Sequence, residues 1–230
     1  MDEFGPYGGT ERRDAHESPQ DVAFELRVGP YRPDVDSEFG SGDGPYARTF
    51  GERTRYLFGI EVDWQALRIP KLGTVGPGLG WGYTQSTADA FIQGSTDRSA
   101  EETNLNVMPM YLVGVLRADV LARETPVPLV PYGKAGFGYA LWWATGPERL
   151  SRDDEGVVGR GASYGLQFAL GGMLLLDSFD RDSAVEMDNT TGVNNSYFFM
   201  EWYHANLNCL GGACMQVGTS TWVLGLALEI

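Results

Sequence analysis

Several acidic and basic side chains of this 230-residue chain stand at every second position inside segments that are otherwise apolar. Such side chains share one face of an extended strand, where opposite charges can pair with one another. We expect a network of ion pairs, with Glu229 as a further candidate member, formed by Glu25, Arg27, Glu61, Asp63, Arg117, Asp119, Lys134 and Glu201. The alternative is that the same face lines a narrow polar pore.

An acidic segment early in the chain offers the oxygen ligands that Ca²⁺ prefers. The candidate ligands are Asp34, Asp36, Glu38 and Asp43. Their spacing lacks the full twelve-residue pattern of an EF-hand, so a plain acidic surface loop is the alternative. We expect no other cofactor.

The two cysteines, Cys209 and Cys214, are separated by four residues, two of which are glycines. In an oxidising compartment this spacing favours a local disulfide that closes a small loop. Free thiols are one alternative. A metal site is another, although it would need more ligands than the nearby His204.

Catalytic motifs are not evident. A lipid hydrolase could use His204, but Asn206 stands where a serine would help, and no nucleophile motif is visible. The four alternating glycines from Gly76 to Gly82 superficially resemble a phosphate-binding loop. That fingerprint needs a turn into a helix, whereas this segment continues as a strand. We therefore expect a protein that is not an enzyme.

Eight segments with apolar residues at every second position must place these side chains. We predict strands over residues 22–28, 56–64, 75–83, 104–120, 130–143, 162–176, 197–205 and 216–230. The phase of 104–120 stays open, because both of its faces are apolar in the middle. If Arg117 and Asp119 point inward, Met108 and Leu112 point outward. A tilted strand needs roughly 9–11 residues to cross a bilayer.

The predicted fold is all-β: an eight-stranded, antiparallel, up-and-down transmembrane β-barrel. An even number of antiparallel strands closes without an exposed edge. Long extracellular loops would follow the first, third, fifth and seventh strands. We expect a short helix from Asp180 to Asn189, in one periplasmic turn. Residues 1–20 would form a flexible N-terminal extension, and residues 21–230 the barrel.

The composition narrows the possible functions. A net charge of −14 repels phosphate backbones, so nucleic-acid binding is not expected. The chain has no run of eighteen apolar residues, which argues against a membrane-spanning helix. Its first residues have no apolar signal-peptide segment, so we expect a mature chain from which a signal peptide has been removed.

Two segments, Val130–Tyr139 and Trp222–Ile230, resemble the small eight-stranded outer-membrane barrels of the OmpX, OmpW and opacity-protein kind. The C-terminal segment is similar to the signal read by the barrel-assembly machinery, although it ends in Ile230 where Phe is usual. Leu26–Pro33 and Gly192–Glu201 resemble a myxobacterial outer-membrane barrel family of undefined function.

This resemblance implies a place in a bacterial outer membrane, surrounded by lipid and lipopolysaccharide, with envelope proteins as further partners. We expect a structural or adhesive protein, or a component of an envelope assembly, that acts through its extracellular loops. A narrow channel for small solutes or ions is the main alternative. A soluble lipocalin-like binder and a lipid-modifying enzyme are further alternatives.

Overall fold

The computed structural model describes residues 21–40, 44–91, 97–146, 158–179 and 190–230. The strands in these residues are β1 (Val22–Tyr31), β2 (Arg55–Trp64), β3 (Leu67–Ile69), β4 (Gly73–Phe91), β5 (Arg98–Arg117), β6 (Leu129–Thr145), β7 (Arg160–Leu175), β8 (Asn195–Asn206) and β9 (Thr219–Glu229). The short helices are α1 (Pro45–Phe50) and α2 (Val120–Glu124), and the 3₁₀ turns are η1 (Val35–Phe39), η2 (Leu176–Ser178) and η3 (Cys209–Gly211).

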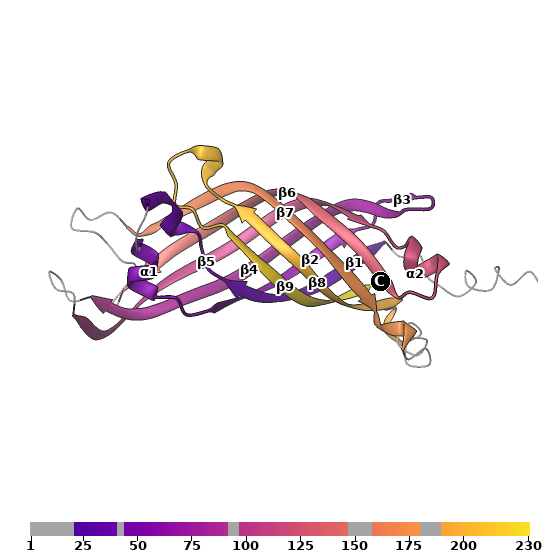
Figure 1. The fold of residues 1–230 in the computed structure, drawn as a ribbon, viewed down its shortest axis with the longest axis horizontal. Helices are drawn as coiled ribbons and strands as arrows, with labels where there is room; N and C mark the ends of the chain where they lie inside the picture. The colour runs from indigo at the N-terminus through magenta and orange to yellow at the C-terminus, as the bar shows by residue number, and fades with distance from the viewer. Residues whose placement is uncertain (1–20, 41–43, 92–96, 147–157, 180–189) are drawn as a thin grey trace, which may run out of the picture.

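Eight of these strands close into an antiparallel barrel (Figure 1). Along the barrel wall each of these eight strands pairs with the next one in sequence, except that β2 pairs with β4 because the short β3 lies between them in the chain. The pairing of β9 with β1 closes the barrel. β3 adds only three residues to the edge of β4. The prediction of an eight-stranded, antiparallel, up-and-down barrel is confirmed.

The two ends of the barrel differ. β1 begins and β9 ends at one end, which we call the terminus end, together with β3 and α2 (Figure 1). β1, β4, β6 and β8 end at the other end of the barrel, which we call the loop end. β4 and β5 contain 19 and 20 residues, so their hairpin projects beyond the shorter β1 and β2 at the loop end.

Apolar side chains cover the outside of the barrel. Phe137 is 65% exposed and Leu170 is 67% exposed, although both lie in the middle of paired strands. The open phase of β5 is resolved, because Arg117 is buried while Leu112 and Leu116 are exposed. Period-two alternation therefore puts apolar residues outside and the polar or small residues of the same strands inside.

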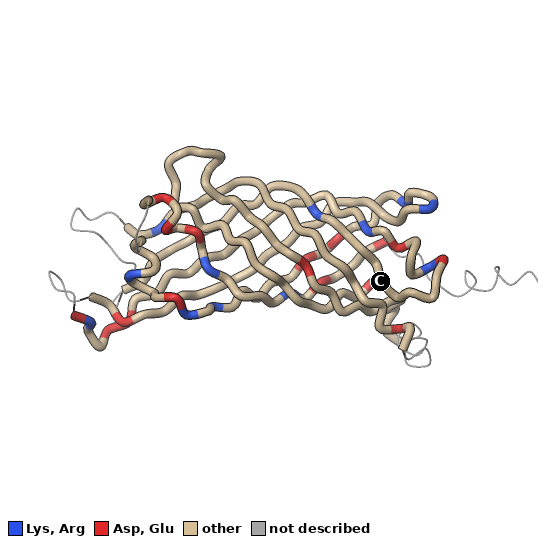
Figure 2. The backbone as a smooth tube through the Cα atoms, viewed as in Figure 1, with Lys and Arg blue, Asp and Glu red and all other residues tan. Residues whose placement is uncertain are grey.

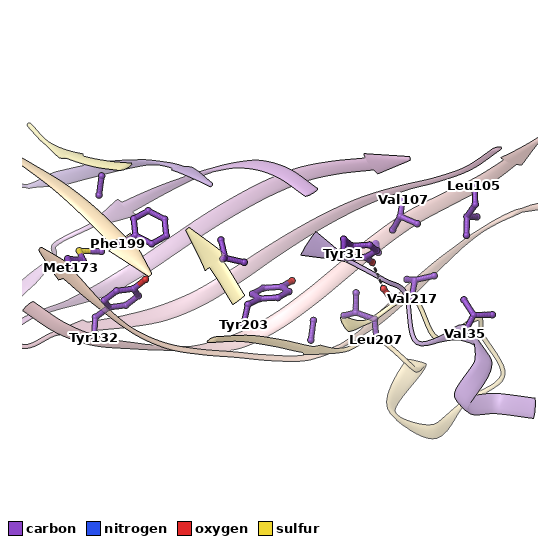
Figure 3. Packing of buried hydrophobic residues seen from close by; sticks show 14 of the residues in the cluster. Tyr31, Val35, Leu105, Val107, Tyr132, Met173, Phe199, Tyr203, Leu207 and Val217 are labelled. Carbon is purple, nitrogen blue, oxygen red and sulfur yellow. Dashed lines mark hydrogen bonds between the residues drawn. The ribbon is translucent and has the colours of Figure 1, made fainter. Parts of the chain in front are cut away.

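The inside of the barrel also holds buried apolar side chains. Figure 3 shows Tyr31, Val107, Leu207 and Val217 gathered in one part of the cluster, and Tyr132, Met173 and Phe199 in another. An eight-stranded barrel has an interior about wide enough to be filled by side chains. The lumen of this chain is packed in that way.

The connections differ from the prediction in their helices. The first long loop contains α1 and η1, and the turn after β5 contains α2, none of which the sequence pattern indicated. The helix predicted over 180–189 and the extension over 1–20 lie outside the described residues. Among the helices that the structure describes, none is long and apolar enough to cross a membrane.

Candidate functional site

A network of buried charges lies in the half of the barrel towards the terminus end, where Figure 2 shows acidic and basic positions on the strands. Its centre is Lys134 of β6, whose Nζ lies 2.7 Å from Oε2 of Glu25 and 2.8 Å from Oε1 of Glu61. Arg27 of β1 pairs with Glu25 at 3.1 Å, and also with Glu61 and with Glu201 of β8. These contacts join strands on different sides of the barrel.

Arg117 forms the second centre of the network, nearer the terminus end. Its guanidinium donates to Oδ2 of Asp63 at 2.5 Å, to Oε1 of Glu25 at 3.0 Å and to Oε1 of Glu229 at 3.1 Å. Glu25 therefore links the two centres, because it accepts from Arg117, Arg27 and Lys134. We call these eight residues the lumen charge network: Glu25, Arg27, Glu61, Asp63, Arg117, Lys134, Glu201 and Glu229.

Three buried tyrosines, which were not expected from the sequence, donate further hydrogen bonds to the lumen charge network. Tyr111 donates to Oε2 of Glu61 at 2.6 Å, and Tyr132 donates to Oε2 of Glu201 at 2.8 Å. Tyr197 donates to Oε2 of Glu229 at 2.9 Å. Each tyrosine lies an even number of residues from a charged residue of its own strand, so strand parity is the signal that could have found them.

The lumen charge network contains more acidic than basic groups. Five carboxylates face three cations, an excess of two negative charges if every group is ionised. Buried charges are tolerated only where counter-charges and hydrogen bonds replace the lost water. The folded lumen must therefore neutralise this excess of two negative charges or stabilise it with hydrogen-bond donors.

Asp119 does not join the network, contrary to expectation. β5 ends at Arg117, and the chain then turns into α2, so strand alternation no longer directs the side chain of Asp119 inward. Its carboxylate lies 3.0 Å from Arg68 and 3.1 Å from Arg123, whose side chains are almost half exposed at the terminus end. The other seven predicted members are brought together.

In the described part of the first loop, the acidic segment does not gather its carboxylates into a metal site. Asp36 instead accepts hydrogen bonds from the backbone N–H groups of Tyr46 and Ala47, at 2.8 and 3.0 Å, at the start of α1. Glu38 accepts from the backbone N–H of Gln216 at 2.5 Å. Asp34 lies at the start of η1, and Asp43 lies outside the described residues.

Carboxylates converge instead inside the lumen. Among the described residues, the group close enough to hold a metal ion is Glu25, Glu61 and Asp63. Lys134 and Arg117 already contact these carboxylates, so their charge is partly balanced by the protein itself.

The first loop folds back over the lumen at the loop end. Tyr46 of α1 is buried, and its hydroxyl lies 2.8 Å from Oγ of Ser86 on β4. Tyr46 and Val35 belong to the buried apolar cluster, and Phe50 packs against it. We call η1 and α1, which lie over this end of the lumen, the cover. Because Asp36 accepts hydrogen bonds from the start of α1, the acidic segment stabilises the cover.

Cys209 and Cys214 form a disulfide, as predicted, in the connection between β8 and β9. The connection folds back through Val217, which is fully buried, and Val217 accepts a hydrogen bond from Tyr31 (Figure 3). The disulfide therefore constrains a segment that also contributes to the cover of the lumen.

A pocket of about 620 Å³ lies at the rim of the loop end, between the first loop and the β8–β9 hairpin. Its lining includes Arg32, Arg53, His204, Asn206 and Ser220. Ser220 lies opposite His204 in the β8–β9 register, a neighbour that was not expected from the sequence. Oγ of Ser220 accepts from the indole of Trp202 at 3.0 Å, and Nδ1 of His204 is buried with no partner among the described residues. The two side chains therefore do not form a linked nucleophile and base through this nitrogen.

Comparison with known proteins supports the fold and leaves the family open. No protein-family model matches the chain, and no curated protein matches its sequence. The outer-membrane protein OprG from Pseudomonas aeruginosa is 13% identical with a TM-score of 0.52, over 93% of this chain and 97% of that one.

Two further solved structures have lower TM-scores. Ail, the attachment invasion locus protein of Yersinia pestis, was solved in complex with the heparin analogue sucrose octasulfate. It is 10% identical with a TM-score of 0.46, over 92% of this chain and 97% of that one. The outer-membrane enzyme PagL is 14% identical with a TM-score of 0.44, over 90% and 99%. The strand topology and the match to OprG show that the chain has the fold of the small eight-stranded outer-membrane β-barrels.

Proposed function

We propose that this protein is an integral barrel of a bacterial outer membrane that binds partners at its loop end, without catalysis or conduction. The observation that carries the proposal is the reversed polarity of the barrel, with an apolar exterior and a charged interior. Soluble proteins rarely expose a continuous apolar surface, whereas membrane barrels present one to lipid. The narrower resemblance to a myxobacterial family stays a prediction from Leu26–Pro33 and Gly192–Glu201.

The position of aromatic residues supports the placement in a membrane. Trp64 ends β2 at the terminus end and is 57% exposed. Trp202 and Trp222 lie opposite each other on β8 and β9, and both face outward. Exposed aromatic side chains near strand ends fit the two interfacial girdles of outer-membrane barrels.

The contents of the lumen favour a closed barrel. Arg27, Lys134 and Arg117 each contact carboxylates from more than one strand, and all three are at least 93% buried. The cover formed by Tyr46 and its neighbours adds a second layer at the loop end. A conducting pore would need a continuous wet path past both layers, so we place the channel second.

The loop end offers the surface on which partners would act. The β4–β5 hairpin projects there, beyond the roughly 9–11 residues that a strand needs to cross a bilayer. The rim pocket opens at the same end, and its lining residue His204 lies two positions from the outward-facing Trp202. We propose lipopolysaccharide as one partner, because its saccharide could meet the polar rim while its acyl chains lie on the apolar wall.

Conductance in a planar bilayer tests the closed lumen. We expect no channel steps from the refolded chain, with a general porin as the positive control in the same bilayer. Reproducible single-channel steps would establish a channel in place of the closed barrel.

Binding of the detergent-solubilised barrel to immobilised lipopolysaccharide tests the role of the loop end. Immobilised phospholipid is the control surface, and we expect selective retention on lipopolysaccharide. A variant in which residues 87–104 are replaced by a two-residue Asn-Gly turn should still fold, since Ser86 and Leu105 are paired, but should bind less. Equal retention on both surfaces would contradict the proposed partner.

A further inference from the structure

Asp63 is the least compensated carboxylate of the lumen charge network. It is 2% exposed, and its carboxylate accepts a hydrogen bond of 2.5 Å from Arg117 through Oδ2. Oδ1 is buried and has no hydrogen-bond partner among the described residues. An ionised carboxylate in such surroundings would carry an oxygen with neither water nor a donor, which is costly in free energy.

The other carboxylates of the network are better supplied with donors. Glu25 accepts from Arg27, Arg117 and Lys134. Glu61 accepts from Arg27, Lys134 and Tyr111. Asp63 therefore stands apart as the group at which the excess of negative charge is least well balanced.

Glu229 accepts from four groups at the terminus end: Gln65, Arg117, Asn195 and Tyr197. Glu201 accepts from Arg27 and Tyr132. Arg117 is meanwhile shared by Glu25, Asp63 and Glu229, so it cannot fully compensate any one of them.

The unpartnered oxygen of Asp63 lies on the same side as an oxygen of Glu61. Asp63 and Glu61 are two residues apart on β2 and pair with Gly78 and Gly80 of β4. A Cβ placed on Gly78 would lie 2.3 Å from Oδ1 of Asp63 and 3.2 Å from Oε1 of Glu61. The missing side chain of Gly78 lets both oxygens approach the backbone there.

We propose that Asp63 binds a proton in the folded barrel and shares it with Glu61. In this arrangement the protonated Oδ1 of Asp63 donates a hydrogen bond to Oε1 of Glu61, while Oδ2 accepts from Arg117. Two carboxylates that lie close together in a low-dielectric site retain a proton, because the doubly ionised pair repels itself. The proton lowers the excess negative charge from two to one, and Glu229 with its four donors holds the remainder.

The proton site is enclosed by charged and titratable groups from most of the barrel. The groups that surround the Asp63–Glu61 pair are Glu25 and Arg27 of β1, Tyr111 and Arg117 of β5, Tyr132 and Lys134 of β6, Tyr197 and Glu201 of β8, and Glu229 of β9. An exposed aspartate in the unfolded chain is already ionised at neutral pH, whereas the folded state would hold the proton, so raising the pH should destabilise the fold. This inference concerns the lumen and does not rest on binding at the loop end.

Infrared spectroscopy of the refolded barrel tests the proposal. At neutral pH we expect the C=O stretch of a protonated carboxyl group, and it should shift when the chain carries aspartate labelled with ¹³C at the side-chain carboxyl. The band should be lost in Asp63→Asn and kept in Asp119→Asn, the matched control outside the lumen. The amide of Asp63→Asn can donate to Glu61 in place of the proton, so we expect this variant to fold.

The infrared spectrum of the labelled wild-type chain tests the proposal even if Asp63→Asn does not fold, because Asp63 is the one aspartate in the described part of the lumen. Absence of a label-sensitive protonated band at neutral pH would overturn the proposal. A melting temperature that rises with Na⁺ but not with choline would also overturn it, since a metal cation would then occupy the place of the proton.

Discussion

Arg117 reaches from β5 across the lumen to donate a hydrogen bond of 3.0 Å to Oε1 of Glu25 on β1, 92 positions earlier in the chain. The same guanidinium also contacts Asp63 and Glu229, so one side chain joins β1, β2, β5 and β9. A contact of this kind ties together strands that are not neighbours in the sheet. The backbone ladder of the barrel wall cannot do this alone.

Replacing Arg117 by Met should destabilise the barrel strongly. The substitution keeps an unbranched apolar side chain but leaves three buried carboxylates without their shared cation, and breaking a buried pair in this way costs about 3–5 kcal/mol. Unfolding in urea, followed by the mobility of unboiled protein on a gel, measures the change. Arg68→Met is the control, because Arg68 is almost half exposed and its pair with Asp119 is worth about 0–1 kcal/mol. Equal stability of the two variants would refute the structural importance of Arg117.

Strand parity explains why much of the lumen charge network could be predicted. An apolar face must point to lipid and the opposite face inward, so the charged residues of each strand are placed without any knowledge of the other strands. The prediction for Asp119 was wrong because side chains alternate between the two faces only within a strand. β5 ends at Arg117, and Asp119 lies in the turn that leads into α2. Tyrosine has no such single preference, since it suits both the lumen and the interfacial girdle, so Tyr111 and Tyr132 were not recognised.

The pairing partners could not be predicted from the sequence. Whether Arg117 reaches Glu25 or Glu201 depends on strand tilt and stagger around the whole barrel, which the alternation of single strands does not contain. The cover at the loop end was also missed. Its central contact joins Tyr46 to Ser86, and its helix is only six residues long, too short to produce a periodic signal.

Replacing Gly80 by Ala should disturb the network through Tyr111. A Cβ at this position would lie 2.0–2.4 Å from ring atoms and the hydroxyl of Tyr111, which donates to Glu61. Overpacking of this kind typically costs about 1–3 kcal/mol. Gly133→Ala is the control, because the nearest atoms to its Cβ are 3.8 Å away. Thermal unfolding monitored by circular dichroism should separate the two variants, and a similar loss in both would argue against the contact with Tyr111.

Removing Ca²⁺ should leave the stability of the barrel unchanged. Asp36 and Glu38, two of the candidate ligands, already accept backbone hydrogen bonds. Asp36→Ala, by contrast, should destabilise the start of α1 by about 0.5–2 kcal/mol, as expected for loss of a capping acceptor. Hydrogen exchange at the amides of Tyr46 and Ala47, measured with and without a chelator, tests both statements. Faster exchange caused by the chelator alone would indicate a bound ion after all.

Reducing the disulfide should loosen the β8–β9 connection without opening the barrel. Cys209 and Cys214 are five positions apart, and closing so short a loop stabilises by about 2 kcal/mol in the chain-entropy model. The bond lies outside the paired parts of β8 and β9, so the wall does not depend on it. Limited proteolysis should cut between residues 207 and 218 only after reduction, while the unboiled protein keeps its gel mobility. Loss of the folded band on reduction would show that the disulfide holds the barrel itself.

The barrel should release no fatty acid from lipopolysaccharide. Ser220 and His204 are neighbours at the rim, but the hydroxyl of Ser220 accepts from Trp202 and Nδ1 of His204 is buried with no partner among the described residues. A serine nucleophile needs a base within hydrogen-bond reach, oriented by a third group. Mass spectrometry of lipopolysaccharide incubated with the refolded chain should show unchanged acylation. Acyl loss that disappears in both Ser220→Ala and His204→Ala, but persists in Trp222→Phe on the same wall, would establish an enzyme and overturn the binding-only proposal.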